Sequence, residues 1–161
     1  MSGDTGIRDA VTGLYVREYF DDVIARELER SRRHGIRLSV VSVALCNLAE
    51  VGGEEDEATL SVVVETARAL QQSVRETDHL FRWEYDEFLL LLFGADEDAC
   101  ALKVQQPDAL FRPWRDGGGP LPISIRVRIG GATHEDGIVF ASVLQAARAT
   151  ARSGVGELPG A

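Results

Sequence analysis

The sequence has few cysteines, a single lysine and no long apolar run. Its two cysteines, Cys46 and Cys100, both have apolar neighbours, which predicts two reduced, buried thiols rather than a disulfide or a metal site. No apolar run approaches the ~20 residues that a membrane-spanning helix needs, and residues 1–9 lack the apolar core of a signal peptide. We therefore expect a cytoplasmic protein without a membrane segment, which can be one module of a larger protein.

The chain also lacks net positive charge. Its 26 acidic residues outnumber the 17 basic ones, which gives a net charge of −9 over 161 residues. A nonspecific nucleic-acid binder needs a basic surface, so no nucleic-acid partner is expected. A small anionic ligand held by a few local arginines stays compatible with this charge. The length fits one domain with a sizeable core.

The pattern of apolar residues predicts alternating helices and strands. The expected helices, each with one apolar face, cover Tyr19–His34, Glu57–Val74, Asp96–Gln106 and Val139–Arg152. The expected strands are Leu38–Leu45, Leu80–Trp83, Phe88–Phe93 and Pro122–Gly130, the last with one wet face. Basic residues before Gly35 indicate the end of the first helix, and Arg112–Leu121, rich in proline and glycine, predicts a loop. The expected core face of the second helix is Leu60, Val63, Val64, Ala67 and Leu70.

Residues 79–93 predict a hairpin around which the rest of the chain is organised. Leu80–Trp83 contains large residues suited to a sheet, and Phe88–Phe93 is a six-residue apolar run typical of a buried central strand. The polar Glu84–Glu87 lies between them and is expected to turn at one edge of the sheet.

This hairpin resembles that of the GGDEF family, the bacterial diguanylate cyclase domain. The family's Gly-Gly-Asp/Glu-Glu-Phe motif sits on such a hairpin, and an Arg-x-x-Asp often lies five residues upstream. Here Arg75-Glu-Thr-Asp78 is followed by five residues and then by Glu84-Tyr-Asp-Glu-Phe88. The family's opening motif is similar as well, through Asp9, Thr12, Gly13, Leu14 and Arg17.

The resemblance covers residues 9–153 and implies one degenerate GGDEF domain. Its fold is expected to be α/β (α+β), with a nucleotidyl-cyclase-like, mainly antiparallel five-stranded sheet covered by helices. Residues 1–8 are expected to form a flexible N-terminus and residues 154–161 a tail.

The resemblance also indicates that the cyclase site has decayed. Family enzymes join two GTP molecules into cyclic di-GMP, with Mg²⁺ held by an aspartate at a strand end and a carboxylate in the turn. Ala44 stands at the first position, and Asp86 remains as a vestigial carboxylate. Glu84 and Tyr85 replace the glycines that let a backbone approach a ligand. The family's guanine-binding Asn and Asp and its C-terminal lysine motif are missing too, so we expect no enzyme activity, no metal and no cofactor, with Asp86 and Glu87 only solvating the turn.

Arg75-x-x-Asp78 is the part of the family pattern that persists, and in the family it is the inhibitory, product-binding site. An arginine fork can hold a phosphate or guanine O6 and N7, and a carboxylate can accept from guanine N1 and N2. Alternatively, Arg75 and Asp78 simply pair with each other at a helix end. The family's second arginine on the following helix is absent, which makes Arg68 and Arg82 the candidates to replace it.

These patterns predict an inactive GGDEF domain that binds cyclic di-GMP at Arg75 and Asp78 in bacterial second-messenger signalling. A downstream protein and a homodimer bridged by the ligand are the expected partners. The alternative is a nucleotide-independent protein-interaction or dimerisation module.

Overall fold

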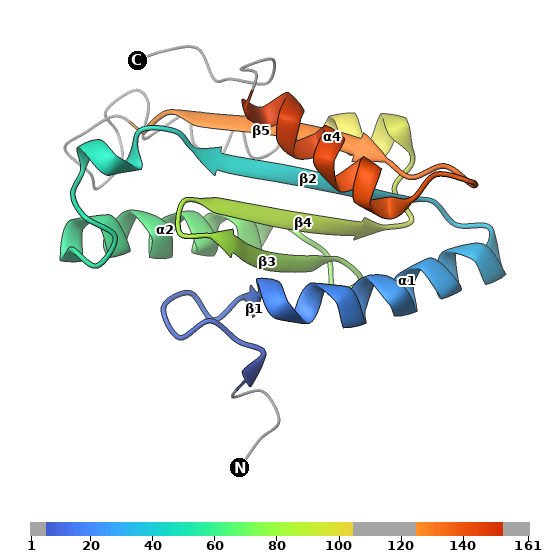
Figure 1. The fold of residues 1–161 in the computed structure, drawn as a ribbon, viewed down its shortest axis with the longest axis horizontal. Coiled ribbons are helices and arrows are strands. Elements are labelled where there is room, and N and C mark those ends of the chain that lie inside the picture. The colour runs from blue at the N-terminus through green and yellow to red at the C-terminus, as the bar shows by residue number, and fades with distance from the viewer. Residues whose placement is uncertain (1–5, 105–124, 153–161) are drawn as a thin grey trace.

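The computed structural model describes residues 6–104 and 125–152, and these form one five-stranded sheet with helices on both faces (Figure 1). The strands are β1 (Tyr15–Val16), β2 (Leu38–Leu45), β3 (His79–Glu84), β4 (Glu87–Phe93) and β5 (Val127–Thr133). Their spatial order is β1-β3-β4-β2-β5. Only the β1–β3 pair is parallel among the named pairs, so the predicted mainly antiparallel sheet is confirmed.

The helices are placed close to where the periodicity predicts them. The α-helices are α1 (Phe20–His34), α2 (Glu57–Ser73) and α4 (Phe140–Arg152), the 3₁₀ helices are η2 (Arg17–Tyr19) and η3 (Leu48–Glu50), and residues 97–104 are also helical. Gly35 ends α1 with a left-handed backbone, φ 66°, as the Gly signal predicts. The expected loop at 112–121 and tail at 154–161 lie outside the described residues.

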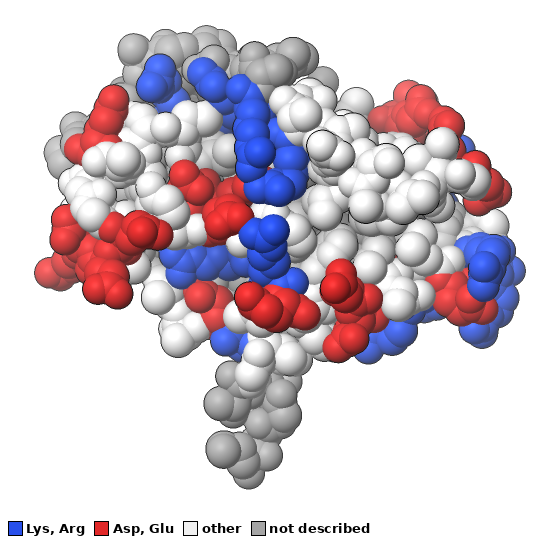
Figure 2. Space-filling view, viewed as in Figure 1, with Lys and Arg blue, Asp and Glu red and all other residues white. Residues whose placement is uncertain are grey.

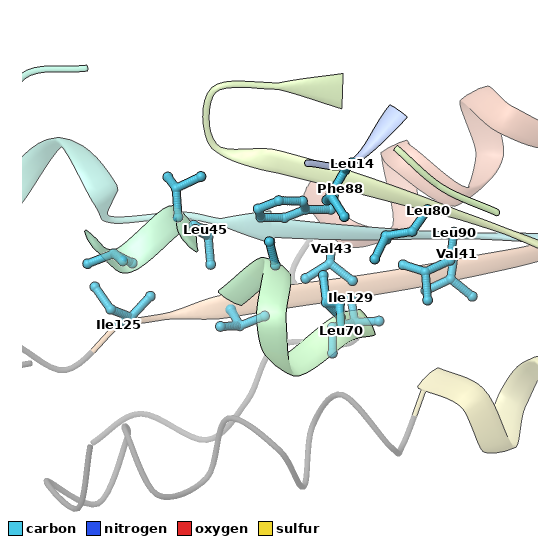
Figure 3. Packing of buried hydrophobic residues seen from close by; sticks show 14 of the residues in the cluster. Leu14, Val41, Val43, Leu45, Leu70, Leu80, Phe88, Leu90, Ile125 and Ile129 are labelled. Carbon is cyan, nitrogen blue, oxygen red and sulfur yellow. The ribbon is translucent and has the colours of Figure 1, made fainter. Parts of the chain in front are cut away.

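Side-chain alternation along β4 divides the core into two clusters. Phe88, Leu90 and Leu92 pack on the α2 side of the sheet, in the cluster drawn in Figure 3. Leu89 and Leu91 point to the opposite face, which α1 and α4 cover. Every residue of β4 is buried, so the predicted buried central strand is confirmed.

The buried face of α2 differs from the expected one. Leu60 and Val64 are only half-buried, whereas Thr59, Val62 and Thr66 are buried. Thr66 tolerates this position because its hydroxyl donates to the Val62 carbonyl at 2.8 Å, which leaves its methyl group to pack. The predicted apolar face of α2 is therefore rotated slightly from the buried face, because the prediction treated threonine as a polar residue.

Two strand boundaries also differ from expectation. The hairpin turn contains only Tyr85 and Asp86, because Glu84 and Glu87 pair across the strands. The last strand, β5, begins at Val127 and runs to Thr133, three residues beyond its expected end at Gly130, since it follows β2, where Thr133 pairs with Ser39. Residues 122–124 of the expected strand lie outside the described range.

One smaller expectation needs correction: Cys46 is exposed, whereas Cys100 is buried as expected. Of the expected N-terminal segment 1–8, residues 1–5 lie outside the described range, and the Ile7 carbonyl accepts from the Val16 N–H at 2.8 Å. Within the described residues, no helix combines the length and apolarity needed to cross a membrane.

Candidate functional site

Arg75 and Asp78 lie in the turn between α2 and β3, and they contact each other. The Asp78 carboxylate is fully covered and accepts from the Arg75 backbone N–H at 2.9 Å and from its guanidinium at 3.3 and 3.5 Å. A further guanidinium N–H donates to the Phe93 carbonyl at 3.0 Å. The Arg75 side chain is nevertheless 60% exposed, and its Nη1 has no hydrogen-bond partner within the described residues. The site therefore presents a fixed arginine whose outer edge faces solvent.

Lys103 is the second cation that the structure brings to this turn. It lies on the helical segment 97–104, and its ammonium donates to the Ser73 carbonyl at the end of α2. Burial lowers the pKa of Lys103, the Asp78 carboxylate acts in the opposite sense, and the charge of Arg75 lowers it further. The hydrogen bond to Ser73 places Lys103 beside the turn that contains Arg75 and Asp78. The resemblance implies an arginine on the helix after the hairpin. The position of Lys103 on that helix could therefore have identified it as a candidate from the sequence.

The two arginines expected as substitutes lie elsewhere. Arg68 is exposed on α2 and pairs with Glu65 at 2.8 Å, more than one helical turn before the helix ends at Ser73. Arg82 pairs across the hairpin with Phe88, five residues and about 17 Å along β4 from Phe93. Arg82 is therefore far from Arg75, so the structure does not support it as a second ligand-binding arginine.

Arg82 instead fastens the N-terminal segment to the hairpin. Its guanidinium donates to both Asp9 carboxylate oxygens at 3.1 and 3.3 Å. Asp9 also accepts from the Thr12 N–H and hydroxyl, each at 2.8 Å, in a turn that Gly13 completes at φ 76°. Burial by itself raises the pKa of Asp9, but the hydrogen bonds from Thr12 and the charge of Arg82 outweigh it and lower the pKa overall.

A cleft of about 890 Å³ lies between this N-terminal turn, the loop before α2 and the end of the hairpin. The resemblance places the guanine-binding and turn motifs of the family on these segments. Six of the residues that line the cleft are acidic and two are basic: Asp9, Glu18, Glu54, Glu55, Asp56 and Glu84 against Arg17 and Arg82. The two arginines are already paired with Glu84 and Asp9. The remaining field repels a triphosphate.

The metal position of the family also lies at this end of the hairpin. Ala44 is in register with Glu87, and the Leu45 N–H donates to the Asp86 carbonyl at 2.8 Å, so positions 44 and 86 are neighbours. Of the residues at positions 44 and 86, only Asp86 is acidic. Burial raises its pKa, a backbone hydrogen bond counteracts this, and the charges of Glu87 and Glu84 raise it further.

These residues do not fit Mg²⁺. The ion needs octahedral oxygen coordination, and a single carboxylate with a raised pKa is a poor ligand set. Within residues 6–104 and 125–152, no group of three or more His, Cys, Asp or Glu side chains is placed to hold a metal ion.

Glu87 does not solvate the turn, which corrects the expectation for this residue. It is 4% exposed and accepts two hydrogen bonds from the Arg148 guanidinium, both at 2.8 Å. The Ser42 hydroxyl donates to it at 2.9 Å, and Arg152 lies 3.6 Å away. Glu87 is thus a buried ion-pair centre that joins β4 to β2 and α4, and its charge is already neutralised within the chain.

Arg17, which belongs to the opening motif of the resemblance, lies in η2 at this same end of the hairpin. Its guanidinium pairs with Glu84 at 2.5 Å and stacks over the Trp83 ring, 4.5 Å from the ring centroid. The two ends of the hairpin therefore differ: Arg75, Asp78 and Lys103 lie near the end of β4, whereas Arg17, Glu84 and Asp86 lie at the turn.

Comparison with known proteins gives a consistent picture. The profile of the family described as "Diguanylate cyclase, GGDEF domain" matches residues 7–153. The chain is 28% identical over 91 residues to the diguanylate cyclase DosC of Escherichia coli (strain K12), a match that covers 56% of this chain and 20% of that protein. It therefore spans about a fifth of the length of that relative.

Solved structures are similar over almost the whole chain. The diguanylate cyclase SiaD of Pseudomonas aeruginosa, solved with its activator SiaC, has a TM-score of 0.81 at 26% identity, over 94% of this chain and 59% of that one. The GGDEF domain of DgcB from Caulobacter crescentus, solved with c-di-GMP, has a TM-score of 0.82 at 15% identity, over 96% and 90% of the two chains. At that identity the second likeness concerns the fold alone.

Proposed function

The chain belongs to the diguanylate cyclase GGDEF domain family, and we propose that it is an inactive member that binds cyclic di-GMP through Arg75. In this proposal the domain is a receptor in second-messenger signalling rather than an enzyme. The single observation that carries it is the exposed, preorganised guanidinium of Arg75 in the turn where the family binds its product.

The loss of catalysis is supported by several independent features. Ala44 cannot ligate a metal, Glu84 and Tyr85 occupy the glycine positions, and the cleft beside them is lined mainly by carboxylates. Glu87 is neutralised by Arg148 and has no charge to spare for a cation. Each feature opposes the binding of GTP with Mg²⁺.

Ligand binding is supported by how Arg75 is held. The buried Asp78 carboxylate and the Phe93 carbonyl fix one edge of the guanidinium, so little side-chain entropy is lost when its outer edge contacts a phosphate or guanine. Lys103 adds a second positive charge beside it. A pair of cations in an otherwise acidic protein is a local site for an anionic nucleotide.

One observation favours the alternative, a nucleotide-independent interaction module. The Asp78 side chain is fully covered and already accepts three hydrogen bonds from Arg75. Recognition of guanine by this carboxylate requires it to exchange at least one of those bonds. If Asp78 stays with Arg75, only the arginine contacts the ligand, and selectivity for guanine is lost.

Calorimetric titration with cyclic di-GMP and with GTP distinguishes the two readings. The receptor proposal predicts binding of cyclic di-GMP by the wild type and a loss of about five- to 150-fold in affinity for Arg75→Ala, since each charge-assisted contact contributes roughly 1–3 kcal/mol. Asp78→Ala weakens binding as well. Arg17→Ala is the matched control, because Arg17 lies at the opposite end of the hairpin.

The result that rejects the receptor proposal is equally specific. No heat from the wild type at about 100 μM protein, a concentration that detects micromolar dissociation constants, would contradict it. Equal binding by wild type and Arg75→Ala would contradict it too. Either outcome moves the interaction module to first place.

A further inference from the structure

The outward face of α4 carries no acidic residue, although 27% of the whole chain is charged. Its exposed positions are all small or uncharged apart from the C-terminal arginine: Ala141, Ser142, Gln145, Ala146, Ala149 and Arg152. The outward surface of α1, by contrast, is covered by charged side chains. In Figure 2 the surface over α4 is accordingly a broad uncharged area with basic side chains at one end.

An apolar groove continues this face toward α1. The groove has a volume of about 450 Å³, and its apolar lining comes from α1, β3 and α4: Phe20, Ile24, Trp83, Phe140 and Leu144. Trp83 is 8% exposed, and its indole N–H has no acceptor within the described residues. An apolar groove with aromatic residues beside a helix face of small, uncharged side chains is typical of a surface that another chain covers.

Charge is distributed unevenly along this surface. Glu18 and Asp21 line the groove beside Ala141, near the N-terminal end of α4, together with Arg17, whose charge is already paired with Glu84. Arg148 and Arg152 line the other end, and the Arg152 side chain is 62% exposed. A two-fold antiparallel pairing of α4 with a second α4 places the basic end of each copy against the acidic end of the other. The surface is therefore complementary to itself.

We propose that this face binds a second copy of the chain, with the two α4 helices antiparallel and the two-fold axis near Gln145. In that arrangement Ala141 of each copy lies opposite Ala149 of the other, and alanines at this spacing let the helix backbones approach closely. The chain carries a net charge of −9, so most of its surface repels a second copy. The α4 face is free of that repulsion, which favours a like partner here.

This dimer is independent of cyclic di-GMP. Arg75 and Lys103 contact the end of α2 and of β4, whereas the α4 face covers the opposite side of the sheet. The association is therefore expected in ligand-free protein and in Arg75→Ala alike. Failure of nucleotide binding would leave it unchanged, and failure of dimerisation would leave the receptor proposal unchanged.

Light scattering after size-exclusion chromatography measures the association without any nucleotide. We expect the wild type to run as a dimer at about 100 μM, a concentration that reveals micromolar affinity. Gln145→Glu places two carboxylates against each other at the two-fold axis and weakens the dimer at least about tenfold. Gln72→Glu, the same change at an exposed position of α2, leaves it intact. Circular dichroism of both variants confirms that the fold is retained.

Cross-linking locates the interface. In a Cys46→Ser background, Gln145→Cys forms a disulfide-linked dimer under mild oxidation, whereas Gln72→Cys stays monomeric on a denaturing gel. A wild type that is monomeric at about 100 μM would overturn the proposal and leave the α4 face to a different occupant. A dimer that survives Gln145→Glu, or in which residue 145 does not cross-link, would overturn it as well, since association would then use another surface.

Discussion

Glu87 keeps the residue type of the family motif but serves the fold. Its carboxylate lies between the Ser42 hydroxyl and the Arg148 guanidinium, with an exposed side-chain fraction of 5% against 19% for Arg148. An isolated carboxylate at this depth is strongly disfavoured, so the arginine from α4 makes the position tenable. The same pairing removes the negative charge that a cation at the hairpin turn would need. A residue that matches a family motif in type therefore need not have the role that the motif implies.

We expect Glu87→Gln to lower the free energy of unfolding by about 3 kcal/mol, because removing one partner of a buried ion pair leaves the other charge uncompensated. Urea unfolding at pH 7 measures it. Asp86→Asn is the matched control and is expected to change stability by at most about 0.5 kcal/mol. Burial and the charges of Glu87 and Glu84 raise the Asp86 pKa despite a backbone hydrogen bond, so ionised Asp86 does not stabilise the folded state. Equal changes in the free energy of unfolding for the two variants would show that Glu87 does not stabilise the fold.

At the scale of elements, the contact between β5 and α4 depends on one glycine. A Cβ atom at Gly130 would lie 2.4 Å from the Ala147 carbonyl oxygen and 2.5 Å from the Ala151 nitrogen, both backbone atoms of α4. The helix therefore lies directly on the strand at this point. This close approach also sets the height of Arg148 above the sheet, and so its reach to Glu87.

Gly130→Ala is expected to cost at least about 2 kcal/mol of stability, since overpacking against backbone forces the helix to move. Gly53→Ala is the control, because a Cβ there meets its nearest neighbour, an Asp56 carboxylate oxygen, at an ordinary 3.6 Å. Thermal unfolding followed by circular dichroism compares the two variants. If Gly130→Ala unfolds at the same temperature as the wild type, α4 does not pack directly against β5 at this position.

At the scale of the whole molecule, charge is segregated. Carboxylates gather around the cleft at the hairpin turn, where we propose that nucleotide binding has been lost. Cations gather at the other end of the hairpin, around Arg75 and Lys103, and at the C-terminal end of α4. A chain of net charge −9 thus has separate regions that repel and that attract an anionic ligand.

This segregation predicts that the protein makes no cyclic di-GMP from GTP and Mg²⁺, and that Ala44→Asp does not restore synthesis. One added carboxylate supplies a single ligand but leaves Glu84 and Tyr85 in the turn and the acidic cleft unchanged. Chromatography of the reaction products measures it, with an active diguanylate cyclase as positive control. Product above the buffer control from either protein would contradict the proposed loss of catalysis.

The sequence by itself determined the order and type of the longer elements, but it did not predict the two-residue strand β1 or the short helices η2 and η3. The predicted bounds of the strand Leu38–Leu45 agree with β2 at both ends, and α2 differs from its prediction by one residue. These features follow from local periodicity and from end signals such as Gly35, which act over a few residues. The spacing between Arg75 and the hairpin, together with the family motifs, likewise predicted the fold.

Only the tertiary structure decided which charged residues meet. Glu87 and Arg148 are 61 residues apart in the chain, Asp9 and Arg82 are 73 apart, and Lys103 reaches Ser73 across 30. No local pattern encodes such pairs, because an arginine on a helix or strand looks the same whether its partner is solvent or a buried carboxylate. The difference arises from burial between packed elements, because a buried charge needs a partner of opposite charge. Arg82 and Glu87 have such partners and stabilise the fold, whereas Arg75 keeps a solvent-exposed edge.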